Sequence, residues 1–331
     1  MKKSVISMCL ALLGSLISMN VYSAIDFRIA HDSQENSPLH ESLLFFKQQL
    51  EQKSDGEFNV QIYPSGQLGG VRETTEMVQH NNIQMTTAAS VLLSPYIPEF
   101  NVLDLFYLFK DEEHAHAVLD GEVGQKLLKA MEKKHFYGLG YGEVGFRNFS
   151  NNIHPLKTLD DFNTLKIRSA DNPTQIIAWK SIGLLPIPLA WGEIYTSLQQ
   201  GLINGQESAL ISILTQRFYE SQKYLSLTKH IYTNHVFFTS LEFWESLNPE
   251  QKNLLSSEIK NTIKLQRRLS KEKNQETLNV LQNKGMEIND VPEDTKEILK
   301  EKLNSSISKQ VKEKAGKELY DYVLKKINSE Q

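Results

Sequence analysis

Two kinds of apolar pattern alternate along the first 90 residues of the chain. Short runs with alternating or continuous apolar residues predict β-strands, and longer runs with apolar residues every three or four positions predict amphipathic helices. Ser37 followed by Pro38 predicts a helix start, and Gly56 marks the end of this helix. The predicted strands are 26–30, 58–64 and 83–89, and the predicted helices are 38–55 and 71–80. This alternation predicts an α/β unit with a parallel sheet.

A glycine-rich stretch, GLGYGEVGFRNFSNN at residues 138–152, follows this unit. Gly140, Gly142 and Gly145 have the G-x-G-x-x-G spacing of a dinucleotide-binding loop. Such a loop requires a strand that leads into a turn and then a helix, whose N-terminal N–H groups bind the pyrophosphate. Two asparagines and Pro155 follow within ten residues, and no helical periodicity appears. We therefore predict an extended segment that crosses between two lobes, with glycine at close backbone approaches or unusual dihedral angles.

A second series of strands and helices follows. The further predicted strands are 136–142, 165–169, 184–190, 203–208 and 231–240, and the further helices lie in 112–134, 174–183, 192–201 and 215–225. The longest helical pattern runs from Pro249 to about Asn283 without glycine or internal proline. At about 1.5 Å per residue it extends roughly 50 Å, longer than one lobe, so we expect it to contact both lobes. We assign residues 25–144 and 234–273 to lobe 1, and 145–233 and 274–331 to lobe 2.

The first 24 residues have the pattern of a secretory signal peptide. Two lysines precede an apolar core from Val5 to Ile17, and a polar stretch with small residues follows. The core is about 13 residues long, whereas a membrane span needs about 20. We expect cleavage after Ser23 or Ala24 and export to the periplasm.

Composition narrows the possible partners and chemistry. Cys9 is the only cysteine, so residues 25–331 offer neither a disulfide nor a thiolate. The formal net charge is −4, and loss of the two N-terminal lysines makes it −6, which argues against nucleic acid or an anionic membrane as partner. His114 and His116 are two positions apart on a predicted helix and make a poor metal pair. We predict no metal and no cofactor.

Several longer segments resemble one family, the extracytoplasmic solute-binding subunits of tripartite ATP-independent periplasmic (TRAP) transporters. They occur in the family's order through nearly all of residues 25–331. The segments are YPSGQLGG.RE, PEFNVLDLFYLFKDEEHAHAVLDG.VG, GFRNFSNN..P.KTLDDFNTLKIRS, G..PIPLAWGEIYTSLQQGLINGQES and F.ESQKYLSLTKH.Y. The resemblance implies an α/β fold with two lobes, a ligand cleft between them and a long helix that spans both.

The resemblance also implies a set of ligand-binding residues. Arg168, in the LKIR strand, corresponds to the arginine that binds the ligand carboxylate through two parallel hydrogen bonds, and Arg147 corresponds to a second arginine. Ser208 departs from the family, which often has asparagine after GQE. The remaining positions that the resemblance places at the ligand are Trp191, Asp171, His31, Ser90 and Glu207. Without the resemblance, an arginine on an alternating strand is more often a surface ion-pair partner, and a tryptophan more often a core residue.

Two function classes stay open at this point. The first is a binding protein, not an enzyme, that captures a small carboxylate and delivers it to a TRAP permease, and we expect it to be a monomer. HAHAVLDG and PLAWGEIYTSLQQG are most similar to members that bind sugar acids and keto sugar acids. The alternative is a secreted α/β enzyme acting on a carbohydrate acid with Glu193, Glu207 or Asp171 as acid or base. It would need two carboxylates that converge on a cleft, and no motif brings them together.

Overall fold

The computed structural model describes residues 24–329, so the predicted signal peptide lies almost entirely outside the described residues. The first βα unit contains β1 (Ile25–Ala30), α1 (Pro38–Lys53), β2 (Phe58–Tyr63), α2 (Val71–Gln79) and β3 (Met85–Ala89). The strands pair in parallel, with β1 between β2 and β3, as predicted. Helix α1 begins as expected, because the Ser37 hydroxyl accepts a hydrogen bond from the His40 backbone nitrogen at 3.2 Å.

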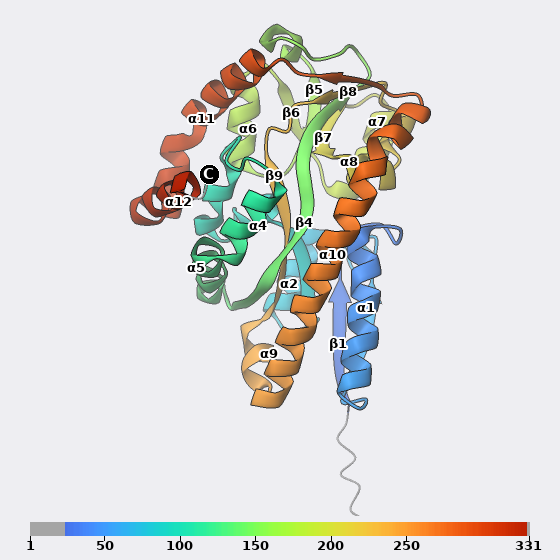
Figure 1. The fold of residues 1–331 in the computed structure, drawn as a ribbon, viewed down its shortest axis with the longest axis vertical. Coiled ribbons are helices and arrows are strands. Elements are labelled where there is room, and N and C mark those ends of the chain that lie inside the picture. The colour runs from blue at the N-terminus through green and yellow to red at the C-terminus, as the bar shows by residue number, and fades with distance from the viewer. Residues whose placement is uncertain (1–23, 330–331) are drawn as a thin grey trace, which may run out of the picture.

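Short helices separate the first unit from the second. They are α3 (Ser90–Leu93), a 3₁₀ segment (Pro98–Asp104), α4 (Glu112–Asp120) and α5 (Glu122–Ala130). The second βα unit contains β5 (Lys166–Ser169), α6 (Pro173–Ser181), β6 (Leu185–Pro188), α7 (Ile194–Gln199) and β7 (Gly205–Ala209). In this unit β5 pairs in parallel with both β6 and β7. Figure 1 shows the two units at opposite ends of the molecule.

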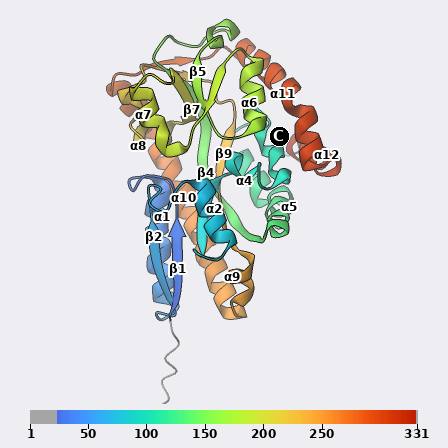
Figure 2. The same ribbon diagram turned by 180° about the vertical axis from the view of Figure 1, so that it is seen from behind.

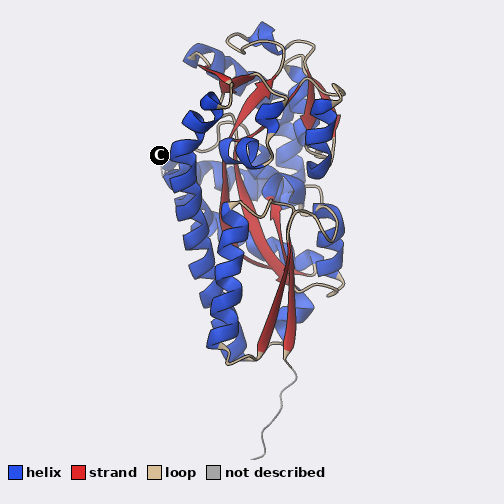
Figure 3. Ribbon diagram, turned by 90° about the vertical axis from the view of Figure 1, so that its right-hand side faces the viewer, coloured by secondary structure: helices blue, strands red, loops and turns tan. Residues whose placement is uncertain are grey.

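Two long strands connect the units. They are β4 (Phe136–Asn151) and β9 (Tyr232–Ser240), which pair antiparallel in the centre of the strand order β2-β1-β3-β9-β4-β7-β5-β6. Helices cover the strands on both sides (Figure 3). The first unit therefore continues into the second through β9 and β4.

The glycines of β4 explain how this strand crosses the molecule. Gly140 has φ +149° and Gly145 has φ +108°, and the pairing with β9 shifts register between Gly138 and Gly140 and again beside Gly145. A Cβ at Gly142 would lie 2.8 Å from the Phe237 ring. The segment is one continuous strand and opens no helix, so the dinucleotide-loop reading is excluded and the predicted extended crossing is confirmed.

The predicted helix at 215–225 is wrong. The helix of this region is α8 (Leu210–Thr215), and it ends before Arg217, whose φ of +58° is left-handed. Residues from Tyr224 to Leu227 form β8, which pairs with β4 and with β10 (Glu287–Asp290). The pairing of β8 with two strands distant in sequence overrides the local helical pattern.

The long helix is confirmed as α10 (Pro249–Asn283), which follows the short α9 (Leu241–Ser246). It contacts α1 of the first unit, the crossing strand β4, and α8 beside the second unit. In Figure 2 it runs behind both ends of the molecule. None of the helices within residues 24–329 combines the length and apolar character that a bilayer crossing requires.

The chain ends in α11 (Glu293–Ala315) and α12 (Lys317–Ser329). Helix α11 packs against α6 of the second unit and against the 3₁₀ segment that follows the first unit. One apolar cluster includes Leu303 and Ile307 of α11, Phe106 and Trp179, so these parts share a core. The predicted lobe boundaries stay a prediction, since the C-terminal helices contact parts of both assigned lobes.

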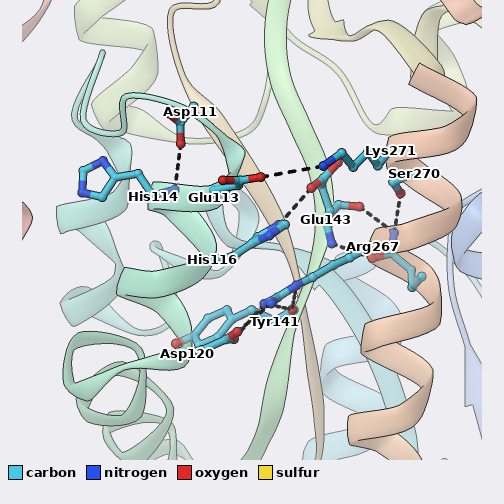
Figure 4. Close-up of polar contacts among 11 residues, drawn as sticks. Asp111, Glu113, His114, His116, Asp120, Tyr141, Glu143, Arg267, Ser270 and Lys271 are labelled. Atoms are coloured by element: carbon cyan, nitrogen blue, oxygen red, sulfur yellow. Dashed lines mark hydrogen bonds and ion pairs between the residues drawn. The ribbon is translucent and has the colours of Figure 1, made fainter. Parts of the chain in front are cut away.

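Polar side chains connect α4, β4 and α10, and Figure 4 shows the two helices on either side of the crossing strand. His116 Nε2 lies 2.9 Å from Glu143 Oε2. Arg267 pairs with Asp120 at 2.6 Å and donates to the Tyr141 carbonyl oxygen at 3.1 Å. These contacts hold β4 at the point where it leaves the first unit.

Candidate ligand-binding cleft

A cleft of about 810 Å³ lies between the two βα units, and a smaller cavity of about 80 Å³ continues it inward. Both spaces are lined from the first unit's side and from the second unit's side. The residues common to both linings are Asp32, Gln34, Leu92, Arg168, Trp191, Thr215 and Gln216. Gln34 Nε2 donates to Gln216 Oε1 at 3.3 Å, so one hydrogen bond already joins the two walls.

Arg168 lies at the inner end of the cleft, near the end of β5. Its side chain is buried, its Nε donates to the Leu189 carbonyl oxygen at 3.1 Å, and its guanidinium carbon lies 5.6 Å from the centre of the Trp191 ring. Burial, followed by repulsion from Arg147, lowers the pKa of Arg168 to about 10, so the group is still charged at neutral pH. Within residues 24–329 it forms no ion pair, which leaves a buried positive charge that an anion can neutralise.

Arg147 differs from Arg168 because the protein already neutralises it. It lines the smaller cavity, and it forms an ion pair with Glu207 in which Nη2 lies 2.9 Å from Oε1. His230 Nε2 lies 3.2 Å from the other Glu207 oxygen. Burial alone would raise the pKa of Glu207, but the charges and hydrogen bonds of Arg147 and His230 outweigh it and lower the pKa to about 2. This cluster therefore fixes β4 to β7 and directs Arg147 toward the cavity.

Two other predicted residues lie on the cleft. Trp191 lines both spaces and packs edge-on against Phe218, with ring centres 5.7 Å apart. Asp171 is exposed and lines the outer part of the cleft. Together with Arg168 and Arg147, four of the eight predicted residues therefore line the cleft or its inner cavity.

The other four predicted residues do not line either space. His31 is buried, with Nε2 3.1 Å from His40 Nδ1, and burial followed by the nearby histidines lowers its pKa to about 3. Ser90 is the first residue of α3 and is buried beside lining residues. Glu207 points to Arg147, and Ser208 is buried on β7 with no hydrogen-bond partner for Oγ among the described residues.

The cleft also contains residues that the sequence did not single out. Asp32 lines both spaces, as Arg168 does, and burial raises its pKa to about 6, although a hydrogen bond from its own backbone and the charge of Arg168 oppose this. Glu143 lines the inner cavity, and Arg72 and Arg217 line the outer cleft. The signal for Asp32 was present, since polar residues at the carboxyl ends of parallel strands face the ligand crevice.

A metal centre has no candidate among residues 24–329, which contain no group of three suitable His, Asp or Glu side chains. His114 Nδ1 accepts a hydrogen bond from the Lys110 backbone nitrogen at 3.1 Å, whereas His116 pairs with Glu143. The two histidines point apart in Figure 4.

Comparison with known proteins identifies the family. The profile described as "Bacterial extracellular solute-binding protein, family 7" matches residues 29–314. The chain belongs to this family. A relative from Escherichia coli, the 2,3-diketo-L-gulonate-binding periplasmic protein YiaO, is 31% identical over 271 residues, which is 82% of this chain and 83% of the relative. A solute-binding protein from Verminephrobacter eiseniae is 34% identical over 263 residues, 80% of this chain and 78% of the relative.

Solved structures agree with this assignment. The sugar acid binding protein DctPAm from Advenella mimigardefordensis, in complex with galactonate, has a TM-score of 0.89 and 30% identity, covering 93% of this chain and 99% of that one. A TRAP periplasmic solute-binding protein from Chromohalobacter salexigens, with bound D-glucuronate, has a TM-score of 0.87 and 26% identity, covering 92% and 100%. The predicted fold, two α/β lobes with a long helix, is confirmed, and so is membership of the TRAP solute-binding subunits. The alternative of a secreted enzyme finds no support in these relatives.

Proposed function

We propose that this family 7 protein binds a sugar acid with one carboxylate on Arg168 and its hydroxyl groups toward the outer cleft. The observation that carries the proposal is the buried charge of Arg168, which forms no ion pair among the described residues. A carboxylate there gains two charge-assisted hydrogen bonds in a partly dehydrated site. The bound galactonate and D-glucuronate of two structural neighbours have this chemistry and support the proposal.

The outer cleft favours hydroxyl groups over a second carboxylate. Four acidic residues line it, Asp32, Glu73, Asp171 and Glu193. Its two outer arginines already pair with carboxylates of their own helical segments, Arg72 with Glu76 and Arg217 with Glu220. Carboxylate oxygens accept hydrogen bonds from ligand hydroxyls but repel a second ligand carboxylate.

A panel of acids tests the ligand class. Galactonate, glucuronate, galacturonate and 2,3-diketogulonate are added separately, succinate represents the dicarboxylates, and melting temperature and product formation are recorded together. We expect saturable stabilisation by at least one sugar acid, weaker stabilisation by succinate and no product. Stabilisation by succinate alone would contradict the sugar-acid assignment, and turnover of an acid would favour the enzyme.

Delivery to a TRAP permease, a monomeric state and the absence of enzymatic activity belong to the same proposal. Export rests on the predicted leader, which the family's extracytoplasmic location supports. Mass analysis of the exported protein is expected to give an N-terminus at Ala24 or Ile25. Exported material that still contains residues 1–20 would contradict cleavage of the leader.

A further inference from the structure

A buried cluster of polar side chains joins the two βα units beside the cleft. Ser94, Asn101 and Asp104 follow the first unit, whereas Asn172 opens α6 of the second unit, four residues after Arg168. Each of the four cluster residues is at most 2% exposed. Polar groups buried this deeply are costly to leave without partners, so their contacts hold these segments in one arrangement.

Asn172 makes two separate sets of contacts. Its Oδ1 accepts hydrogen bonds from the backbone nitrogens two and three residues further on, at 2.8 and 3.3 Å, and so caps α6. Its Nδ2 reaches the other unit's side, where it lies 2.9 Å from the Val91 carbonyl oxygen, 2.9 Å from Ser94 Oγ and 3.0 Å from Asp104 Oδ2. Because an amide nitrogen carries only two hydrogens, these three acceptors use its full donor capacity.

The partners of Asn172 are themselves tied together. Ser94 Oγ donates to Asp104 Oδ2 at 2.8 Å, and Asn101 Nδ2 donates to the Ser94 carbonyl oxygen at 2.9 Å. Thr174 Oγ1 donates to Asn101 Oδ1 at 3.0 Å, which is a second link from α6. Burial raises the pKa of Asp104 to about 7, although the hydrogen bonds from Asn172 and Ser94 oppose this.

The cluster lies directly behind the cleft walls. Val91 lines the inner cavity and its neighbour Leu92 lines both spaces, while Asp171, next to Asn172, lines the outer cleft. A shift of α6 away from α3 would therefore move the end of β5, with Arg168, relative to the opposite wall.

We propose that Asn172 is a positioning residue whose amide group holds the Arg168 wall of the cleft against Val91, Ser94 and Asp104. It thereby sets the separation of the two βα units and the place at which Arg168 meets a ligand. The part that concerns affinity rests on the proposed function, whereas the part that concerns the separation does not.

The chain offers a reciprocal exchange as a test. Asn172→Asp retains a capping oxygen for α6, loses both donors and places a second carboxyl beside Asp104. The double variant with Asp104→Asn restores one amide and one carboxyl with exchanged positions. Asn248→Asp is the matched control, because Asn248 caps α10 in the same manner but is exposed.

The first measurement needs no ligand. Leu44 and Leu202 are 49% and 51% exposed in the first and second units, and residues 25–331 contain no cysteine, so Leu44→Cys and Leu202→Cys accept spin labels in the exported protein. We expect the distance distribution between the labels to shift or broaden in Asn172→Asp, to return in the exchanged pair, and to stay unchanged in the control. A wild-type distribution in Asn172→Asp, or no recovery in the exchanged pair, would overturn the proposal.

The second measurement is calorimetry with the acid that stabilises the wild type most. We expect Asn172→Asp to weaken binding by about tenfold or more and the exchanged pair to recover it. If the wild type binds none of the acids, the proposed function fails, while the label distances still decide the role of Asn172. If Asn172→Asp does not fold, Asn172→Ser replaces it, because serine caps the helix without the amide donor.

Discussion

Replacing Glu207 with glutamine tests whether this residue holds Arg147 in place. The change keeps the size of the side chain and removes its charge, so that Arg147 loses its ion-pair partner inside the protein. Glu207 is fully buried, and its pKa moves from 4.5 to about 2 in the folded protein. At about 1.4 kcal/mol per pKa unit, this shift corresponds to stabilisation on the order of 3 kcal/mol at neutral pH. Breaking a buried ion pair costs a similar roughly 3–5 kcal/mol.

The dependence on pH has a definite sign. Because the folded-state pKa of Glu207 lies below the unfolded value, its stabilisation is complete above about pH 4.5 and is lost as the pH falls toward 2. Urea unfolding at pH 7 is expected to show Glu207→Gln less stable than the wild type by about 3 kcal/mol. This difference is expected to shrink as the pH falls from 4.5 toward 2, because Glu207 then becomes protonated in the unfolded wild type and, near pH 2, in the folded wild type as well.

Glu287→Gln is the matched control for this measurement. Glu287 pairs with Lys223 at 3.1 Å, but its side chain is 59% exposed, so its loss should change stability by less than about 1 kcal/mol. Substitutions at exposed positions usually change the free energy of unfolding by less than about 0.5 kcal/mol. If Glu207→Gln changes it by no more than that, the buried ion pair does not stabilise the fold.

Two further substitutions test the crossing strand and the buried histidine. Gly142→Ala places a Cβ 2.8 Å from the Phe237 ring, so we expect about 1–3 kcal/mol of destabilisation in urea unfolding. Gly192→Ala is the control and should be nearly neutral, because no atom lies within 4 Å of its Cβ. Equal effects of the two substitutions would refute the close approach at Gly142. The folded-state pKa of His31 is about 3, against 6.5 unfolded, so the folded state is favoured fully above pH 6.5 and loses stability as the pH falls below it. Between pH 7 and pH 5 we expect the free energy of unfolding to fall by about 2 kcal/mol less in His31→Gln than in the wild type. An equal fall in both proteins would show that His31 is not held neutral.

The sequence predicted the alternating units and the long helix because each has a strong local period and clear ends. Pro249 and Asn283 bound α10 as expected. The helix prediction failed at 215–225, where pairing of β8 with distant strands decides the structure. The sequence analysis also did not resolve the two C-terminal helices. Helix α11 packs against α6, and both helices pack against the 3₁₀ segment, so their packing involves residues far apart in the chain.

At the candidate site, too, local sequence patterns predicted some residues and missed those whose position depends on distant parts of the chain. Arg168 was predicted because its LKIR strand resembles that of the TRAP solute-binding family, and the structure places it on the cleft. His31 was predicted and its neighbour Asp32 was not considered, but successive side chains at a strand end point in different directions, and Asp32 is the one on the cleft. The pairing of Glu207 with Arg147 joins residues 60 positions apart, so no local pattern reveals that Glu207 points inward.

Calorimetry on Arg168 variants tests the central claim most directly. With the acid identified from the panel, Arg168→Ala is expected to bind at least about tenfold more weakly, because charge-assisted hydrogen bonds contribute roughly 1.5–3 kcal/mol, while its melting temperature without ligand changes little. Arg168→Lys should also bind poorly, since it keeps the charge and loses the planar pair of donors. If Arg168→Ala binds within about threefold of the wild type, a difference of roughly 0.65 kcal/mol, Arg168 does not bind the carboxylate.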